Sequence, residues 1–193
     1  MRVLAINGSS RKNGNTAIAL NTVMEELEKQ GIETEMIELA GYTINPCKAC
    51  FTSGGKNNCS FDNDMFAEIF EKMIEADGII LGSPVYSADV SSNMKALIDR
   101  GAVVADMNSQ ILKHKIGASV VACRRAGGLN AIDTLNHFFL NHEMFVVGST
   151  YWNMVYGQMP GDVKNDEEGM ANMKNLGENM AYLVKKIGGN ENE

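Results

Sequence analysis

The stretch Asp77-Gly78-Ile79-Ile80-Leu81-Gly82-Ser83-Pro84 contains a short apolar run that no polar residue interrupts. A strand with one solvated face would alternate between apolar and polar side chains, and this run does not. We therefore predict a central strand that is covered on both faces. Gly82-Ser83-Pro84 closes the strand, because glycine and proline interrupt regular secondary structure.

Around this strand, short apolar runs alternate with longer stretches of helical periodicity. The other strands are expected at residues 3–6, 33–39, 117–123 and 144–147, and the helices at residues 15–30, 64–76, 92–104, 127–141 and 166–187. Asp62 or Asp64 is the expected cap of the second helix. Five such alternations predict one α/β domain over residues 1–187, with helices on both faces of a parallel sheet. Residues 188–193 form a polar tail.

Composition narrows the choice of partners. The chain has 193 residues and a net charge of −7. An acidic protein has no general attraction for phosphate backbones, so we expect no nucleic-acid binding. No stretch reaches the ~20 apolar residues that a membrane-spanning helix needs, and the N-terminus lacks a signal-peptide pattern. We expect a cytoplasmic protein that does not contact membranes.

The loop after the first strand, Gly8-Ser9-Ser10-Arg11-Lys12-Asn13-Gly14-Asn15-Thr16, combines polar donors with two glycines. It opens a helix, whose first N–H groups and positive dipole end attract anions. We therefore expect a terminal phosphate to bind there. The candidate residues are Ser9, Ser10, Arg11, Asn13, Asn15 and Thr16. The glycine spacing fits neither a dinucleotide loop nor a Walker loop. A plain turn, capped by one of these side chains, is the alternative.

Two more strand ends carry unusual loops, and open α/β sheets bind ligands at the carboxyl ends of their strands. The third strand leads into Ser83-Pro84-Val85-Tyr86-Ser87, where Pro84 stiffens the backbone and Tyr86 offers an aromatic face with a hydroxyl. The fourth leads into Arg124 and the pair Gly127-Gly128, which permits a close approach to a ligand. An edge tyrosine after an ordinary turn is one alternative. Arginines that bind the phosphates of a nicotinamide cofactor are another.

The sequence Ser83-Pro84-Val85-Tyr86, followed by the helix Ser91-Ser92-Asn93-Met94-Lys95-Ala96-Leu97-Ile98-Asp99-Arg100, closely resembles the flavodoxin-like NAD(P)H-dependent FMN reductase family. The loop at residues 8–16 resembles the same family, and the similarity is closest to its iron–sulfur flavoprotein branch. Lys95 and Arg100 lie on this helix. A role in the binding site and a plain surface role, facing solvent or pairing with Asp99, are equally good explanations of these two residues.

This resemblance implies a flavodoxin-like three-layer sandwich, with a five-stranded parallel sheet in the order 2-1-3-4-5. It also implies a noncovalent FMN held by the three loops. The implied cofactor-binding residues are Ser9, Ser10, Arg11, Asn13, Asn15, Thr16, Ser83, Pro84, Val85, Tyr86, Ser87, Arg124, Gly127 and Gly128. The flavin N5 accepts the hydride, so we expect no catalytic side chain.

The implied activity is the transfer of reducing equivalents from NADH or NADPH, through bound FMN, to an acceptor. The acceptor could be a quinone, a nitro or azo compound, a free flavin, a metal ion or a redox protein. A homodimer or homotetramer is expected from the family. Two alternatives stay open: an electron-transfer flavoprotein that exchanges electrons with ferredoxin, and a redox sensor that acts through its cysteines.

Cys47, Cys50 and Cys59 fall in one loop. In iron–sulfur flavoproteins, a compact four-cysteine motif at this place carries a [4Fe–4S] cluster, but here Ser53 occupies the third cysteine position. Such clusters are normally held by four thiolates, and serine ionises far less readily, so we expect no cluster. The alternatives are a cluster completed by serine, water or an exogenous ligand, a zinc site, or a regulatory disulfide. Cys123 is expected to be a small buried hydrophobe.

Overall fold

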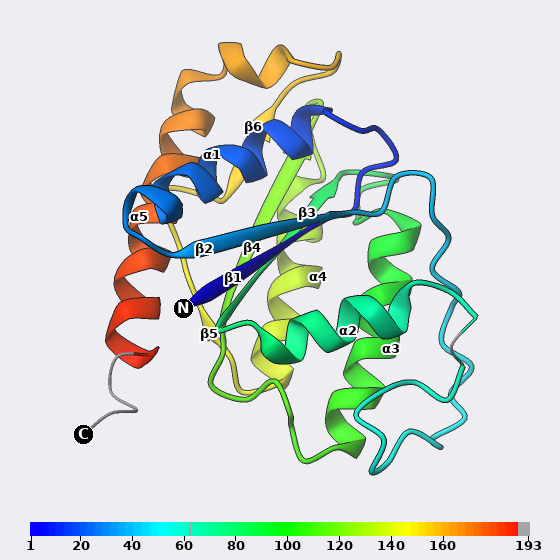
Figure 1. Ribbon diagram of the computed structural model, residues 1–193. Helices are drawn as coiled ribbons and strands as arrows, with labels where there is room; N and C mark the ends of the chain where they lie inside the picture. Colours follow the sequence, from blue (N-terminus) through cyan, green and yellow to red (C-terminus); the bar gives the residue numbers. More distant parts are fainter. Residues whose placement is uncertain (62, 189–193) are drawn as a thin grey trace.

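The computed structural model describes residues 1–61 and 63–188. These residues form one sheet with helices on both faces (Figure 1). The strands are β1 (Arg2–Asn7), β2 (Glu33–Glu38), β3 (Gly78–Pro84), β4 (Ile116–Cys123), β5 (Phe145–Val146) and β6 (Met154–Tyr156). The helices are α1 (Asn15–Lys29), α2 (Phe66–Glu75), α3 (Ser92–Met107), α4 (Gly128–Asn141) and α5 (Glu167–Gly188), with a short 3-10 turn, η1 (Asp162–Asn165).

All strand pairs in the sheet are parallel, in the order β2-β1-β3-β4-β5. The predicted strand order is confirmed. β1 pairs with β2 on one side and with β3 on the other, so the chain reverses its direction of winding at this point. In such sheets the reversal opens a crevice at the carboxyl ends of the strands.

Two apolar cores lie on opposite faces of the sheet. Leu4 and Ile6 pack with α2, α3 and α4, whereas Val3 and Ala5 pack with α1 and α5. This alternation follows from the two-residue period of a strand. β3 divides its side chains in the same way, and its apolar residues are fully buried, as predicted for a central strand. Figure 1 shows α1 and α5 together on one side of the sheet.

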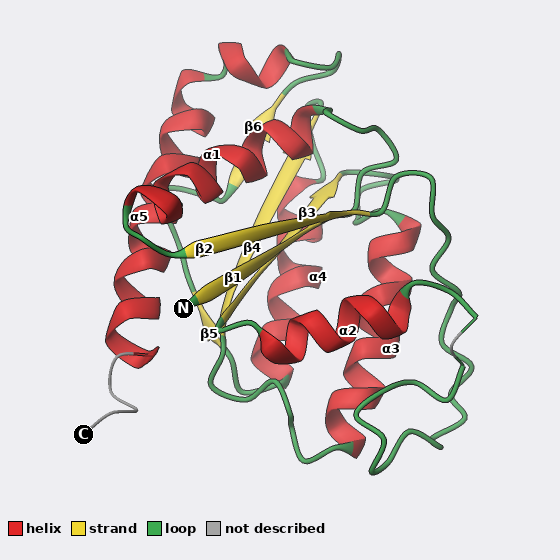
Figure 2. Cartoon of the chain, in the orientation of Figure 1, coloured by secondary structure: helices red, strands yellow, loops and turns green. Residues whose placement is uncertain are grey.

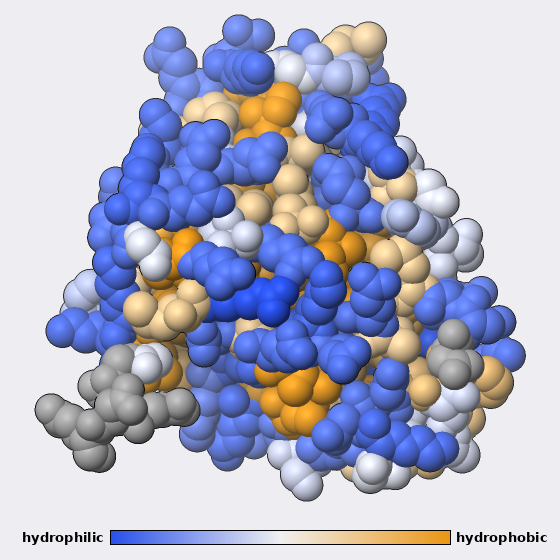
Figure 3. Space-filling model, viewed as in Figure 1, coloured by the Kyte–Doolittle hydropathy of each residue, from blue (hydrophilic) through white to orange (hydrophobic). Residues whose placement is uncertain are grey.

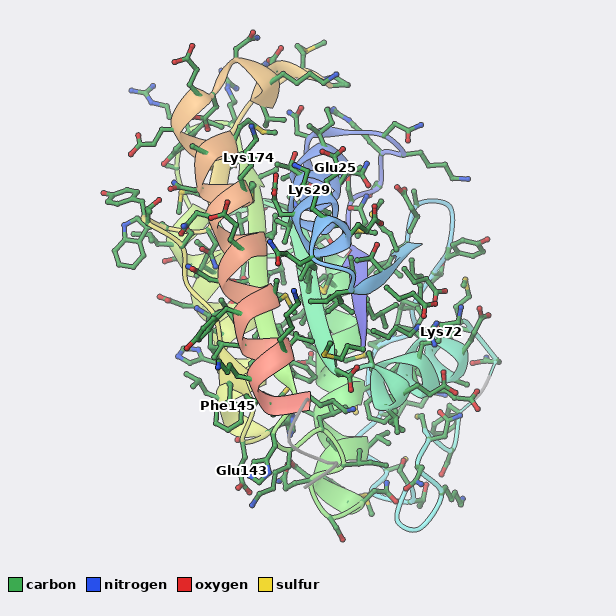
Figure 4. The ribbon with its side chains drawn as sticks, turned by 60° about the vertical axis from the view of Figure 1, so that its left-hand side comes forward. Glu25, Lys29, Lys72, Glu143, Phe145 and Lys174 are labelled. Carbon is green, nitrogen blue, oxygen red and sulfur yellow. The ribbon has the colours of Figure 1, made fainter. Side chains whose placement is uncertain are left out.

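The fifth strand position differs from the prediction. β5 comprises only Phe145–Val146 and pairs with the start of β4, whereas β6 pairs with the end of β4. The chain leaves the sheet between them, so two short strands share one edge. We predicted a single strand over residues 144–147 and missed β6, because its three residues are too few to show a period. Phe145, marked in Figure 4, is 45% exposed and stacks on His114.

The helix ends match the predictions to within a few residues. α2 begins at Phe66, whose backbone N–H donates to Asp64 Oδ1 over 3.1 Å. Met65 occupies the cap position, and Asp64, one residue earlier, accepts from the first N–H of the helix, whereas Asp62 lies outside the described residues. Ser91 caps α3 by accepting from the N–H of Met94 over 3.3 Å. Of the predicted polar tail, only Gly188 is described, and it ends α5.

Charged side chains protect the open edge of the sheet at β2. Glu35 on β2 pairs with both Arg2 and Lys72. Lys72 lies on α2 and is labelled in Figure 4. Figure 3 shows that the face over β2 and α2 is mainly hydrophilic, with separate apolar areas. Charges on an edge strand disfavour pairing with a second sheet. Within the described residues, no helix combines the length and hydropathy that crossing a bilayer requires.

Candidate functional site

The carboxyl ends of β1, β3 and β4 surround an open hollow of about 800 Å³. Eight of the predicted cofactor-binding residues line it: Ser9, Arg11, Asn15, Thr16, Pro84, Val85, Tyr86 and Arg124. Three residues that the sequence did not single out also line it: Ala122, Gly157 and Gln158. The lining omits Ser10, Asn13, Ser83, Ser87, Gly127 and Gly128. The topology thus gathers four distant loops at one site, those after β1, β3, β4 and β6.

The loop after β1 is shaped by its own backbone and side chains. The Gly8 N–H donates to the carbonyl of Gly82 over 2.7 Å, which ties the loop to the end of β3. The Ser9 N–H donates to Asn7 Oδ1, and the Arg11 N–H donates to Ser9 Oγ. α1 then begins after Gly14 without a side-chain cap and without an acidic residue in its first turn. This helix start therefore offers its N–H groups and positive dipole end to an anion.

Asn15 lines the hollow and also ties two loops together. Its side-chain amide donates to the carbonyl of Met159 and accepts from the Gly161 N–H, over 3.0 and 2.8 Å. Both ends of the amide thus hold the loop that follows β6 against the start of α1. A Cβ on Gly157 would lie 2.8 Å from Asn15 Nδ2, so this close contact needs a glycine. Gly157 and Gln158 would have been candidates had the short strand before them been recognised.

The loop after β3 forms a second wall of the hollow. The Val85 N–H donates to the carbonyl of Ala122 over 3.0 Å, which fixes the loop to β4. Tyr86 is 44% exposed, and its hydroxyl lies 3.5 Å from Ser10 Oγ across the hollow. Ser83 is fully buried and has a structural role, since its hydroxyl accepts from the Ser91 N–H and donates to the carbonyl of Pro84.

Gly127 allows the start of α4 to approach this wall. Its φ of +86° lies in the left-handed region, and an added Cβ would lie 2.8 Å from the Cα of Ala88. Gly128 packs instead under the sheet edge, against Met154 and Cys123. Cys123 is 3% exposed, as predicted, and burial raises the pKa of its thiol. Arg124 is exposed at the rim of the hollow.

A second pocket, of about 610 Å³, lies away from this hollow, in the long loop between β2 and α2 that Figure 2 draws in green. Cys47, Cys50 and Cys59 line it together with Ser53. All three thiols are free and partly buried. Hydrogen bonds from Thr52 lower the pKa of the Cys50 thiol. The structure thus brings together the residues that the sequence comparison grouped by register.

Arg100 clamps both ends of this cysteine loop. It is 2% exposed and donates to the carbonyls of Asn45 and Phe61, which flank the three cysteines, over 3.4 and 2.6 Å. Its guanidinium pairs with Asp64 at 2.5 Å and lies 4.1 Å from the ring centre of Phe66. For Arg100, both explanations that the sequence offered, exposure to solvent and pairing with Asp99, are therefore wrong.

The sequence held a signal for this clamp. Buried Leu97 and Val104 lie three residues before and four residues after Arg100 on α3. Helical periodicity therefore places Arg100 on the buried face, where an arginine needs polar partners. Lys95 on the same helix is exposed and pairs with Asp99 over 2.5 Å, as expected.

A family model and individual proteins both match this chain over most of its length. The family model "NADPH-dependent FMN reductase" matches residues 1–158. The iron-sulfur flavoprotein MJ1083 of Methanocaldococcus jannaschii is 40% identical over 97% of this chain and 99% of its own length. The iron-sulfur flavoprotein of Methanosarcina thermophila is 36% identical over 77% of this chain and 78% of its own.

Solved structures agree on the fold. The flavodoxin, WrbA-like protein from Agrobacterium tumefaciens superposes with a TM-score of 0.66 at 16% identity, over 96% of this chain and 98% of that one. At this identity the likeness concerns the architecture, and the predicted flavodoxin-like sandwich is confirmed. The family match covers well over half of the residues and includes every residue that lines the hollow. The chain belongs to the NADPH-dependent FMN reductase family.

Proposed function

We propose that this protein is an FMN-dependent oxidoreductase that takes reducing equivalents from NADH or NADPH and passes them to an acceptor. The observation that carries the proposal is the open hollow at the carboxyl ends of β1, β3 and β4. It combines an uncapped helix start and Arg11 with the aromatic face of Tyr86. A phosphate at one end and a planar ring at the other fit this arrangement.

Different residues suit the phosphate and the ring of FMN. The start of α1, with Ser9, Thr16 and Arg11, suits the phosphate, because backbone N–H groups, hydroxyls and a guanidinium all favour an anion. Val85 and Tyr86 suit the ring, since the loop that carries them is tied to β4. FMN itself supplies the hydride acceptance and electron release.

The hollow leaves access for a second ligand. It is open to solvent, and the exposed guanidinium of Arg124 stands at its rim. We assign Arg124 to the phosphates of the nicotinamide cofactor or to the flavin edge. A small planar acceptor, such as a quinone, a nitro or azo compound or a free flavin, fits the same open face. A metal ion or a redox protein remains a further class of acceptor.

Titration of FMN-free protein with FMN tests the binding site. Arg11→Ala should weaken FMN binding roughly 10- to 150-fold, the usual effect of losing a charged hydrogen bond. Lys12→Ala is the matched control, because Lys12 is an exposed neighbouring cation outside the lining of the hollow. Equal affinities in the two variants would show that the phosphate binds elsewhere or without the arginine.

Anaerobic reduction tests the activity. NADPH or NADH added to the FMN-loaded protein should bleach the flavin absorbance, and a quinone should then restore it. A protein that binds FMN yet stays oxidised with both nicotinamide cofactors would rule out the reductase and leave the carrier.

The second candidate is an electron-transfer flavoprotein with a redox protein such as ferredoxin as its partner. The gathering of Cys47, Cys50 and Cys59 in one pocket favours it, because thiolates in such sets hold redox centres. Reduction of the flavin by reduced ferredoxin, but not by either nicotinamide cofactor, would identify this function. A redox sensor that acts through these cysteines would need neither electron donor.

The expected homodimer or homotetramer remains a prediction. Tyr151 and Trp152, 61% and 52% exposed, lie beside an apolar groove between α4 and the edge of the sheet. We assign this surface to a second copy of the chain. Sedimentation should show an oligomer that Trp152→Ser weakens, and a monomeric wild type would refute the assignment.

A further inference from the structure

The loop after β3 contains a small hairpin, residues 86–89, which we call the Tyr86 hairpin. The Tyr86 N–H donates to the carbonyl of Asp89 over 2.8 Å, and the Asp89 N–H donates to the carbonyl of Tyr86 over 3.0 Å. Ser87 and Ala88 make the turn between them. Tyr86 lines the hollow, whereas Asp89 lies outside its lining. The backbone of Asp89 therefore fixes the residue that forms the aromatic wall.

The turn of the Tyr86 hairpin is strained. Ser87 and Ala88 have φ of +49° and +65°, and positive φ at both central residues defines a type I′ turn. Such turns favour Asn-Gly or Asp-Gly, because the left-handed region is unfavourable for most residues that carry a Cβ. Both residues are also exposed. The conformation that holds Tyr86 therefore depends on contacts from outside the turn.

Helix α4 provides these contacts at two places. An added Cβ on Gly127 would lie 2.8 Å from the Cα of Ala88, so the start of α4 lies directly against the turn. Farther along α4, the hydroxyl of Thr134 donates to Asp89 Oδ1 over 2.8 Å. The same oxygen accepts from the Val90 N–H over 2.7 Å. Asp89 thus links the backbone of the hairpin to a side chain 45 positions away.

Thr134 contributes little to its own helix. Threonine is β-branched, which lowers its helix propensity, and inside a helix its hydroxyl can bond the carbonyl of the preceding turn. A hydroxyl has one proton, and here Thr134 donates it to Asp89. Thr134 is half-buried and lies outside the lining of the hollow. Its side chain therefore supports the hairpin rather than the helix.

We infer that Thr134, acting through Asp89, positions Tyr86 against the ring of FMN. The hydroxyl holds the Asp89 carboxylate, and the paired backbone of Asp89 holds Tyr86. A hydrogen bond to a carboxylate is among the stronger ones, so its loss should loosen the hairpin. The inference rests on the proposed function, because it concerns how that site holds the ring. The phosphate end is built from another segment, the start of α1, so the two ends can be tested separately.

The first experiment measures the affinity of the flavin-free, full-length protein for FMN and for riboflavin, which has the ring but no phosphate. Thr134→Val removes the hydroxyl at nearly constant volume, Thr134→Ala removes it with a better helix former, and Thr134→Ser keeps it. Thr34→Val is the matched control, because the Thr34 hydroxyl also donates to a carboxylate, that of Glu28, and Thr34 lies on β2 outside the lining of the hollow.

Thr134→Val and Thr134→Ala should weaken the binding of both flavins about tenfold, the lower end for loss of a charged hydrogen bond. Thr134→Ser and Thr34→Val should keep affinities close to those of wild type. Arg11→Ala should weaken FMN and leave riboflavin unchanged. Circular dichroism of each variant reports folding.

Two further readouts separate positioning from general stability. In a Tyr86→Leu background, Thr134→Val should cause no further loss of FMN affinity, because the wall that it positions is already absent. Amide hydrogen exchange needs no flavin. In Thr134→Val, the N–H groups of Tyr86 and Asp89 should exchange at least about tenfold faster than in wild type.

Four results would overturn the inference. Three of them leave the proposed function standing: unchanged flavin affinity in both Thr134→Val and Thr134→Ala, an equal loss in Thr134→Ser, or an undiminished loss in the Tyr86→Leu background. The fourth is unchanged amide exchange at Tyr86 and Asp89, which would show that the hairpin keeps its shape without the hydroxyl. A wild type that binds neither flavin would instead refute the proposed function, and the inference would fall with it.

Discussion

Removal of the Arg100 guanidinium should destabilise the protein far more than loss of a surface charge. In Arg100→Met, three hydrogen bonds and the contact with the Phe66 ring disappear, and the Asp64 carboxylate, 4% exposed, loses its counter-charge. Breaking a buried pair from one side costs about 3–5 kcal/mol. This is a large part of the ~5–15 kcal/mol that folding provides. The melting temperature should fall by roughly 6–20 °C.

The assay is urea unfolding followed by circular dichroism, with the free energy of unfolding compared between variants. Lys95→Met is the matched control, since its pair with Asp99 lies on the same helix but is half exposed. It should change stability by no more than about 0.5 kcal/mol. Arg100→Lys keeps the charge but loses the two-armed geometry, so it should fall between the two. A loss below about 1 kcal/mol in Arg100→Met would refute the clamp.

Three further predictions concern other parts of the fold. Gly127→Ala should cost about 1–3 kcal/mol and weaken FMN binding, because its φ is +86° and Ala88 leaves no space for a Cβ. Burial lowers the pKa of His142, despite Asp106 nearby, so the unfolded chain binds its proton more readily. Stability should therefore fall as pH drops below about 6.5, and His142→Phe should flatten this slope in urea titrations. Glu35→Gln should cost about 1 kcal/mol or less, and less still in high salt.

Local patterns suffice to predict the architecture. The apolar run at residues 79–81 has the composition of a buried strand, and Ser91 caps the following helix as its side chain allows. The strand ends then point to one edge of the sheet, where eight of the predicted residues indeed line a hollow. Each of these features depends on residues that are close to one another in the chain. A single sequence is therefore enough to predict them.

Contacts between distant residues account for what the sequence did not reveal. Arg100 and Asp64 are separated by 36 positions, and no local pattern pairs them. The amide of Asn15 also donates to the carbonyl of Met159, in the loop after β6 and 144 positions away, and no local pattern shows this contact. His142 is fully buried beside Phe138, and its Nδ1 lies 3.0 Å from Gln110 Oε1, a contact across 32 positions that no local pattern indicates.

The Arg100 clamp also determines when the cysteine loop takes up its shape. The two ends of the loop are joined through one buried side chain, so the entropy of closing the loop is lost when the chain folds. Many small metal sites instead form only when the metal arrives and unfold when it is removed. Here protein contacts alone hold the two ends of the loop together. The shape of the cysteine loop therefore comes with folding itself, and a chelator should change neither the melting temperature nor the circular dichroism of the protein.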